Sequence, residues 1–376
     1  MENYNIKNWD DLDLKPELLR GIYSYGFENP SEIQKLAIYP IIQKRDVIAQ
    51  AQSGTGKTGT FSISAIQTTD ASLNETQTLI IAPTRELVTQ TSNVLQSIST
   101  FIDGLKVKTL VGGTNVKEDI EYLKNNIPHI IIGTSGRIFD MFKRRKINLH
   151  TIKLFILDEA DEMLSYGFQG QIQELFQYFN NNIQIAIFSA TMPDEMLSIT
   201  NKFMNDPFKI TMQADTLSLD GIAQYYIAMF NYDEKYTWLK SIFNQMNSTT
   251  AIIFVNDVDN VIDLYNSMKE DGFPVCHMHG SLPKDERNNT MNDFKQNKYN
   301  IMISSNLTAR GIDVQQVNLV INYDIPNNVH TYLHRIGRSG RWGKKGTAIN
   351  FVCQQDIHKM KNIERHYKIN INEFVM

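Results

Sequence analysis

The chain carries at positions 51–58 the stretch Ala51-Gln52-Ser53-Gly54-Thr55-Gly56-Lys57-Thr58. It fits the phosphate-binding pattern G-x-x-x-x-G-K-[ST], with alanine in place of the first glycine. The apolar run at 46–50 predicts a buried strand before it, and we expect a helix to begin near Lys57. Glycines let backbone N–H groups turn toward a polyphosphate, and a helix N-terminus adds partial positive charge. The stretch therefore predicts a strand, a phosphate-binding loop and a helix, in that order.

Two side chains of this loop have further predicted roles. We expect the Lys57 ammonium to reach the β- and γ-phosphates of a nucleotide, and the Thr58 hydroxyl to help hold Mg²⁺. The predicted nucleotide contacts of the loop are Ala51, Gln52, Ser53, Gly54, Thr55, Gly56, Lys57 and Thr58.

Length and composition restrict the class of protein. The 376 residues are too many for one compact domain and suit two. Hydrophobic residues make up 42% and charged residues 21%, which is ordinary for a globular cytosolic protein. The 37 basic and 41 acidic side chains give a formal charge of −4, so a nucleic-acid partner would bind in a local groove, not to a generally basic surface.

The sequence shows no sign of a membrane role. Residues 1–5 are polar and contain no apolar signal segment, and the apolar runs elsewhere are too short to cross a bilayer. The two cysteines, Cys276 and Cys353, predict ordinary thiols in a reducing compartment, and no pattern supports a disulfide between them. We expect a cytoplasmic location, with the nucleus left open.

Short apolar runs alternate with amphipathic stretches in two parts of the chain. Strand candidates in the first part are 46–49, 78–82, 106–111, 129–133, 154–158 and 184–189, with helices such as 85–98 and 116–125 between them. The pattern stops near residue 207 and restarts with strand candidates at 250–255, 274–278, 299–304, 318–322 and 347–352. Such alternation is typical of βαβ units in a parallel sheet. It predicts two tandem α/β domains at 1–212 and 223–376, joined by a flexible linker at 213–222.

The strand candidate at 154–157 runs directly into acidic residues. A carboxylate at such a strand end, close to a phosphate loop, can hold Mg²⁺ through its water shell, and we assign this role to Asp158. The neighbouring Glu159 is the candidate general base that orients or deprotonates the attacking water.

Residues 158–161 read D-E-A-D, and with this motif the chain resembles the DEAD-box RNA helicases from Trp9 to about Ile369. The resemblance implies two tandem RecA-like domains, each a mainly parallel sheet flanked by helices. It also implies that ATP and Mg²⁺ are cofactors and that single-stranded or partly duplex RNA is the partner.

The segment at 7–35 resembles the family's Q motif. The Gln34 amide offers both a donor and an acceptor to the N6 and N7 edge of adenine. The resemblance implies that Phe27 stacks on the base and that Trp9 is the isolated upstream aromatic of the nucleotide site.

Three stretches of the first domain resemble RNA-contact motifs, and such contacts to the RNA backbone carry no base sequence. The implied RNA-binding residues there are Pro83, Thr84, Arg85, Gly112, Gly113, Thr134, Gly136 and Arg137. The family usually has proline where Ser135 stands, which predicts a less rigid loop. Ser189 and Thr191 match the coupling motif, and Asp161 is the acid that they are expected to tie to the domain interface.

The stretch at 334–341 matches the last motif of the family without a change. The resemblance implies that Arg338 and Arg341 are arginine fingers on the γ-phosphate, because guanidinium forks suit phosphate oxygens. His334 of the same motif is assigned to coupling. Asp313 is expected to bind the ribose hydroxyls, and Trp342 to cover the adenine face opposite Phe27.

The second domain also contains predicted RNA contacts, and departures from the family pattern cluster there. The implied contacts are Asn256, Gly280, Arg287 and Ser305. Ser281 and Lys284 stand where Asp and Gln are common. Asn306 replaces a usual Asp near the coupling region, so we expect weaker or differently tuned coupling of ATP hydrolysis to RNA.

These motifs predict an RNA-stimulated ATPase that separates short duplexes locally and non-processively, in translation initiation or messenger RNA metabolism. Three alternatives stay open: an ATP-gated RNA clamp in a larger complex, a DNA translocase, and a metabolic P-loop kinase, of which the last fits the paired arginines poorly. We expect a monomer. A translation-initiation scaffold protein is a candidate partner, although the linker lacks the lysines expected for it.

Overall fold

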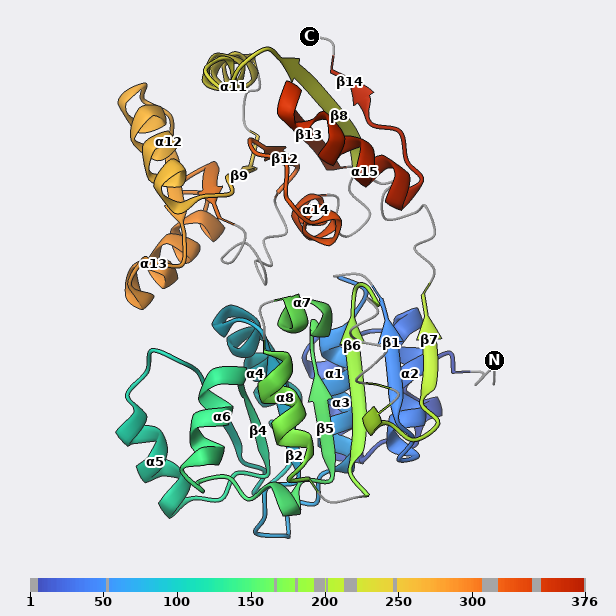
Figure 1. Ribbon diagram of the computed structural model, residues 1–376. Helices are drawn as coiled ribbons and strands as arrows, with labels where there is room; N and C mark the ends of the chain where they lie inside the picture. The colour runs from blue at the N-terminus through green and yellow to red at the C-terminus, as the bar shows by residue number, and fades with distance from the viewer. Residues whose placement is uncertain are drawn as a thin grey trace. The chain divides into compact units, whose positions relative to one another are not determined.

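The computed structural model divides the chain into two compact units, Met1–Ala214 (unit 1) and Asp215–Met376 (unit 2). It describes residues 6–51, 54–165, 168–179, 182–192, 200, 202–212, 222–245, 249–305, 317–339 and 346–374. Each unit contains one seven-stranded sheet in which all pairings are parallel (Figure 1). The predicted tandem α/β architecture with mainly parallel sheets is therefore confirmed.

Unit 1 alternates strands with helices because buried apolar runs are separated by amphipathic stretches. Its strands are β1 (Val47–Gln50), β2 (Thr78–Ala82), β3 (Val107–Leu110), β4 (Ile130–Thr134), β5 (Leu154–Leu157), β6 (Gln184–Ser189) and β7 (Phe208–Thr211). Its helices are η1 (Trp9–Leu12), α1 (Pro16–Ser24), α2 (Glu32–Ile42), α3 (Lys57–Thr68), α4 (Arg85–Ile98), α5 (Val116–Asn125), α6 (Ser135–Lys143), η2 (Leu149–Thr151), α7 (Ala160–Ser165) and α8 (Gln169–Phe176).

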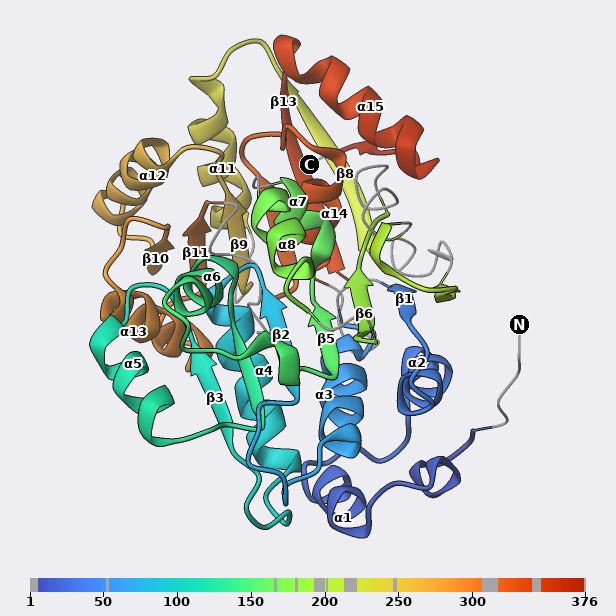
Figure 2. The same ribbon diagram turned by 60° about the horizontal axis from the view of Figure 1, so that its bottom comes forward.

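The sheet of unit 1 has the order β3-β4-β2-β5-β6-β1-β7. Figure 2 shows β3, β2, β5, β6 and β1 following one another in this order. Two apolar clusters cover it: α1 to α4 pack on one face, and α6, α7 and α8 pack on the other. α1 and α4 approach so closely that a Cβ on Gly21 would lie 1.9 Å from the carbonyl oxygen of Ile98.

Unit 2 repeats this plan. Its strands are β8 (Ile222–Met229), β9 (Ala251–Phe254), β10 (Val275–Met278), β11 (Ile301–Ser304), β12 (Leu319–Asn322), β13 (Gly346–Cys353) and β14 (Asn372–Glu373). Its helices are α11 (Glu234–Gln245), α12 (Val258–Glu270), α13 (Lys284–Lys295), α14 (Val329–Ile336), η3 (Gln354–Asp356) and α15 (Ile357–Tyr367). The strand order is β10-β11-β9-β12-β13-β8-β14.

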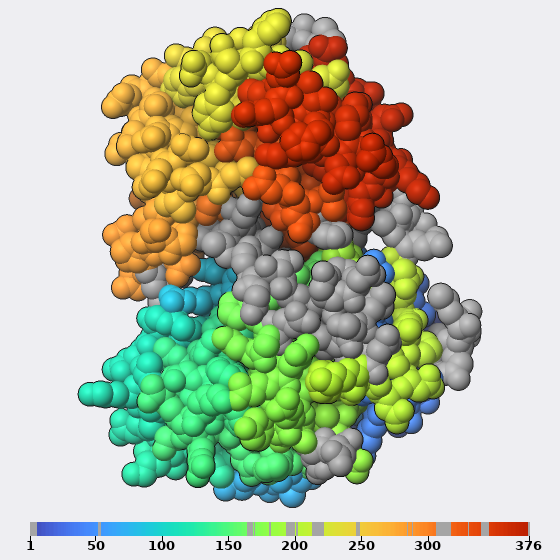
Figure 3. Space-filling model, in the orientation of Figure 1, coloured from blue at the N-terminus to red at the C-terminus, as the bar shows by residue number. Residues whose placement is uncertain are grey.

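Helices again cover both faces of this second sheet. α11 and α12 pack on one face, and α13, α14 and α15 pack on the other. On the side of unit 2 seen in Figure 3, the surface is formed by α11 (yellow), α12 and α13 (orange) and α15 (red). Both cysteines are buried and free, and burial raises the pKa of the Cys276 thiol to about 12.

The sequence analysis missed three strands, β7, β8 and β14. β8 is the instructive one, because it begins at Ile222, the last residue of the predicted linker. Its burial alternates between buried and more exposed positions, unlike the continuously buried strands β2 and β5. Its partners β13 and β14 lie more than 100 residues further along the chain, so pairing makes it a strand. No described helix combines the length and the apolar character needed to cross a bilayer.

Candidate functional site

The predicted site residues of unit 1 gather at the carboxyl ends of its strands, where parallel sheets bind ligands. The predicted nucleotide-side segments follow β5, β6 and β1, which are neighbours in the sheet. The predicted RNA-side segments follow β3, β4 and β2, which are also neighbours in the sheet. The sheet therefore separates the two sets, and the boundary lies between β2 and β5.

The phosphate loop leads directly into α3, which begins at Lys57. Gly54 and Gly56 adopt φ values of 86° and 104°, a region that glycine enters without steric cost. Lys57 is 5% exposed, and its Nζ donates to the Ala51 carbonyl at 2.9 Å and to Glu159 Oε1 at 3.3 Å. The ammonium is thus held at the mouth of the loop between a carbonyl and an acid.

The turn after β5 places two acids side by side in a buried position. Glu159 has φ 47°, a left-handed conformation that costs a non-glycine residue about 1–3 kcal/mol. Its Oε2 is buried and has no hydrogen-bond partner among the described residues. Burial, and then the Glu159 carboxylate, raise the pKa of Asp158 to about 7, against the lowering effect of Lys57. Buried acids with an unmet acceptor and a raised pKa suit a cation or a water molecule.

Gln34 lies against the phosphate loop and is 4% exposed. Its Oε1 accepts from Ser31 N at 2.6 Å, and its Nε2 donates to the Gly56 carbonyl at 3.3 Å. Gly59 of α3 permits this approach, because a Cβ there would lie 2.6 Å from Gln34 Nε2 and 3.2 Å from the Phe27 ring. The Q-motif segment and the phosphate loop are therefore packed as one piece.

Trp9 occupies a different place from the one that a base contact requires. Its ring is fully buried in the core, with 0% exposure. Its Nε1 donates to the Phe27 carbonyl at 3.0 Å, and its ring stacks on that of Phe27 with centroids 6.3 Å apart. A buried ring can position Phe27 but cannot itself stack on adenine, so we revise the predicted role of Trp9 to support of Phe27.

Side chains after β6 bind the acid of the D-E-A-D segment. Asp161 Oδ2 accepts from Thr191 Oγ1 at 2.6 Å and from Thr191 N at 3.1 Å. Ser189 Oγ accepts from Asp161 N at 3.2 Å. These are the contacts that the coupling hypothesis expects within unit 1, and the coupling role itself stays a prediction.

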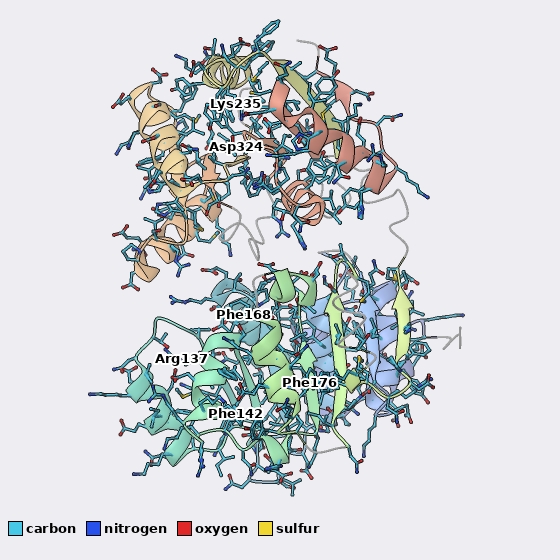
Figure 4. The ribbon with its side chains drawn as sticks, viewed as in Figure 1. Arg137, Phe142, Phe168, Phe176, Lys235 and Asp324 are labelled. Carbon is cyan, nitrogen blue, oxygen red and sulfur yellow. The ribbon has the colours of Figure 1, made fainter. Side chains whose placement is uncertain are left out.

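On the RNA side of unit 1, two arginines are held by the loops next to them. The Arg85 guanidinium packs on Gly113, where a Cβ would lie 1.9 Å away, and Gly113 has φ 73°. Arg137 is buried, pairs with Asp119, and donates to the Thr114 hydroxyl at 3.0 Å (Figure 4). Lys108 completes the cluster through Asp119 at 3.0 Å. Arg137 thus ties the loops after β3 and β4 together.

The remaining RNA-side residues of unit 1 occupy the same loops. Thr84 caps α4 by accepting from Leu87 N, and the Thr134 hydroxyl accepts from Gly112 N, both at 3.3 Å. Pro83 precedes that cap, and Gly136 lies in the first turn of α6, with nothing within 4 Å of a Cβ built there.

In unit 2, Asn256, Gly280 and Ser305 follow β9, β10 and β11, which are neighbours in the sheet. Gly280 is exposed, Ser305 is buried, and Arg287 lies in the first turn of α13. The Asn256 side chain is engaged at both ends, accepting from Arg335 Nη2 at 2.6 Å and donating to the Ile325 carbonyl at 3.0 Å.

The described part of the last motif consists of the end of α14 and the turn that follows it. His334 and Arg338 are 8% and 5% exposed, and Arg338 Nε donates to the His334 carbonyl at 3.0 Å. Several predicted residues lie outside the described residues: Gln52, Ser53, Asn306, Asp313, Arg341 and Trp342.

Some residues that act on the predicted ones were not themselves predicted. Asp119 pairs with Arg137, Gly59 admits Gln34, and Asp324 holds Asn256 together with Arg335 of the predicted last motif. Among the unpredicted residues, only Gly59 had a local signal, as a glycine inside a helical pattern. Asp119 and Asp324 are ordinary charged residues whose partners lie far away in the sequence.

Known proteins resemble this chain along nearly its whole length. Residues 31–199 match the model of the DEAD/DEAH box helicase family, and residues 234–343 match the helicase conserved C-terminal domain. Over 373 residues the chain is 48% identical to the ATP-dependent RNA helicase eIF4A of Meyerozyma guilliermondii, covering 99% of this chain and 94% of that protein. Over 371 residues it is 46% identical to eukaryotic initiation factor 4A-III homolog A of Oryza sativa subsp. japonica, covering 99% and 91%.

Solved structures give the same result. S. cerevisiae Dbp5 bound to RNA and ADP BeF3 matches with a TM-score of 0.89 and 33% identity, covering 98% of this chain and 95% of that chain. The chain therefore belongs to the DEAD-box family of ATP-dependent RNA helicases, which are RNA-stimulated ATPases.

Proposed function

We propose that this helicase couples ATP binding and hydrolysis to closure of its two units on single-stranded RNA and to local, non-processive unwinding of short duplexes. We place this activity in translation initiation or another step of messenger RNA metabolism, because the relatives at 48% and 46% identity are named as eIF4A and eukaryotic initiation factor 4A-III.

One observation carries the proposal: nucleotide-side and RNA-side segments share one sheet and meet at the boundary between β2 and β5. A backbone hydrogen bond crosses this boundary, because Asp158 N donates to the Ile81 carbonyl at 2.9 Å. Residues 83–85 follow β2, and residues 158–161 follow β5. A shift of one segment is therefore passed to the other through a few bonds, which is the physical requirement for linked binding.

The residues of unit 1 fit ATP with Mg²⁺. Asp158 and Thr58 would hold the ion, which would neutralise phosphate charge when bound. The fit rests on the raised pKa of Asp158 and the unmet acceptor of Glu159, since a nearby cation would relieve both. Lys57 would exchange its Ala51 and Glu159 partners for phosphate oxygens. Glu159 would then orient the attacking water and accept its proton.

We propose that Arg338 and Arg341 complete the site from unit 2 as arginine fingers, so that neither unit hydrolyses ATP efficiently alone. The RNA-side residues would grip the sugar–phosphate backbone without reading bases. Opening a base-pair step costs roughly 1.4 kcal/mol on the DNA stacking scale, so one closure can disrupt only a few pairs. This is why the proposed unwinding is local.

The partner proposal goes beyond RNA. We propose a monomer that acts in the cytoplasm and docks on a translation-initiation scaffold through the surface of its units. The precedent is that S. cerevisiae Dbp5 is itself described in complex with Gle1 and IP6. Whether this chain binds a comparable protein is a separate test from its activity.

The test is a steady-state ATPase and unwinding assay on the full chain. We expect RNA to stimulate multiple-turnover ATP hydrolysis, and unwinding to fall steeply as the duplex is lengthened from about one to two helical turns. Single-turnover hydrolysis followed by stable retention of RNA would instead support the clamp alternative. Equal stimulation by DNA would support a DNA translocase.

A further inference from the structure

Lys235 lies outside every motif of the sequence analysis and is buried in unit 2. It is on α11, is 1% exposed, and donates from Nζ to the Tyr323 carbonyl at 2.5 Å and to Asp324 Oδ1 at 2.8 Å (Figure 4). The ring centroids of Tyr232 and Tyr323 lie 4.3 Å and 5.2 Å from the ammonium. Removing the acid from beside so fully enclosed a lysine would leave a buried group without its ion-pair partner, which is costly.

Asp324 also binds the loop after β9. Its Oδ2 accepts from Asn256 N at 3.0 Å, and its backbone N donates to the Phe254 carbonyl at 3.2 Å. Both carboxylate oxygens of Asp324 are thus engaged, one by α11 and one by the segment that bears a predicted RNA contact.

Arg335 of α14 closes the network from the other side. It is 2% exposed, and its guanidinium donates to three acceptors: Asn256 Oδ1 at 2.6 Å, the Asp324 carbonyl at 2.7 Å and Asn322 Oδ1 at 3.1 Å. Arg338, the predicted arginine finger, lies three residues further along the chain. The rigid guanidinium fork therefore joins the β9 loop to the helix that leads to Arg338.

We propose that Lys235, Asp324 and Arg335 are positioning residues that hold the β9 loop and α14 as one rigid piece, so that RNA bound at the loop and nucleotide sensed through Arg338 act on each other. This inference rests on the proposed function, which assigns the RNA side to Asn256 and the nucleotide side to Arg338. Buried polar networks restrict a structure most when every member has a partner, and this one crosses the boundary between β9 and β12.

The experiment measures ATPase activity of the full chain against the concentration of single-stranded poly(U). We expect Asp324→Asn and Lys235→Met each to raise the poly(U) concentration for half-maximal stimulation at least tenfold, with less than threefold change in half-saturation by ATP. Each single variant breaks the same Lys235–Asp324 contact, so the double variant should raise the half-saturation by poly(U) no further than the single variants do. Arg335→Lys keeps the charge but loses the fork, and should behave like the single variants; it also serves as the test if they fail to fold.

The matched control is Ile242→Ala, which opens a cavity under α11, where Ile242 is 1% exposed, without touching the network. It should lower the thermal stability of the full chain and leave the poly(U) half-saturation within twofold. The inference is overturned if the network variants match Ile242→Ala in both measurements, or if the single effects simply add in the double variant. A wild-type chain that shows RNA stimulation but no unwinding contradicts the proposed function and leaves this inference standing.

Discussion

Each unit contains one lysine–acid pair at the same topological place, and the two pairs are used differently. The strand orders correspond one to one, so that β8 matches β1 and β12 matches β5. Lys57 begins α3 after β1 and meets Glu159 after β5 at 3.3 Å. Lys235 lies in the first turn of α11 after β8 and meets Asp324 after β12 at 2.8 Å.

The surroundings of the two pairs differ in unmet hydrogen-bonding capacity. The loop before Lys57 contains Gly54 and Gly56, and Glu159 keeps one buried oxygen without a partner among the described residues. The loop before Lys235, at 230–233, contains no glycine, a tyrosine ring covers the ammonium, and both oxygens of Asp324 are engaged. The first pair keeps unmet hydrogen-bonding capacity, which a phosphate could use, and the second is closed by its own protein. Unmet capacity, and not the lysine–acid pair itself, therefore distinguishes the proposed reactive site.

We expect the largest effect from a variant that breaks the Lys57–Glu159 pair. Glu159→Gln should lower ATP turnover by about 10²–10⁴-fold, because it removes the general base while preserving side-chain shape. ATP affinity should stay within a few-fold, and RNA should dissociate more slowly. Steady-state ATPase and nucleotide titration measure the two effects. Turnover within tenfold of the wild type would remove Glu159 from its proposed role.

Neutralising one buried acid after β5 and one after β12 should change the free energy of unfolding in opposite directions. Asp324→Asn leaves Lys235 buried without its anion and should lower the free energy of unfolding by about 3 kcal/mol. Asp158→Asn should raise it, by about 1–2 kcal/mol at pH 8, because the pKa of Asp158 is raised from 3.8 to about 7 and its ionised form is disfavoured in the ligand-free fold. Denaturant unfolding of the full chain measures both.

The pH dependence supplies the control for this pair of variants. Folding raises the pKa of Asp158 from 3.8 to about 7. The contribution of this carboxyl to the free energy of unfolding is therefore greatest below pH 3.8 and is lost as the pH rises toward 7. The gain from Asp158→Asn should therefore be larger at pH 8 than at pH 5. A gain that does not change between these pH values, or two variants with effects of the same sign, would contradict the comparison.

Gly59→Ala tests whether packing of Gln34 against α3 is needed for ATP binding. Its Cβ would lie 2.6 Å from Gln34 Nε2, so Gln34 has to move, although alanine by itself favours a helix by up to about 1 kcal/mol. We expect the ATP concentration for half-maximal activity to rise about tenfold, which corresponds to the loss of one hydrogen-bonded contact. Thermal stability should be unchanged or higher. Gly170→Ala is the control, because its Cβ would meet nothing within 4 Å. Equal ATP half-saturation in both variants would rule out packing of Gln34 on α3 as a determinant.

The smallest expected effect concerns Asn306, which stands after β11, outside the described residues, where the family commonly has Asp. Asn306→Asp should raise RNA-stimulated turnover about twofold by restoring one carboxylate near the coupling region, worth about 0.4 kcal/mol in the barrier. Asn292→Asp, at an exposed position of α13, controls for net charge. An unchanged rate with RNA would show that this departure does not tune coupling.

Local patterns in the sequence were sufficient for much of this protein. The phosphate loop, the D-E-A-D acids and the alternation of strands and helices follow from neighbours in the chain, and α4 and α5 have the predicted bounds. β8 was missed because its buried and exposed positions alternate and its pairing partners are distant. The role of Trp9 was assigned by analogy, and its full burial was not visible in a single aromatic residue.

Chain order alone thus determined which residues are candidates for the chemistry: a glycine-rich loop with its lysine, acids at a strand end, and arginines late in the sequence. The order of the strands decided which of them meet. Lys235 and Asp324 lie 89 residues apart, and Arg137 and Asp119 are separated by a strand and a loop, so no periodicity relates them. The physical reason is that burial and ion pairing depend on which strand ends become neighbours, and that is fixed only when distant segments pack into one sheet.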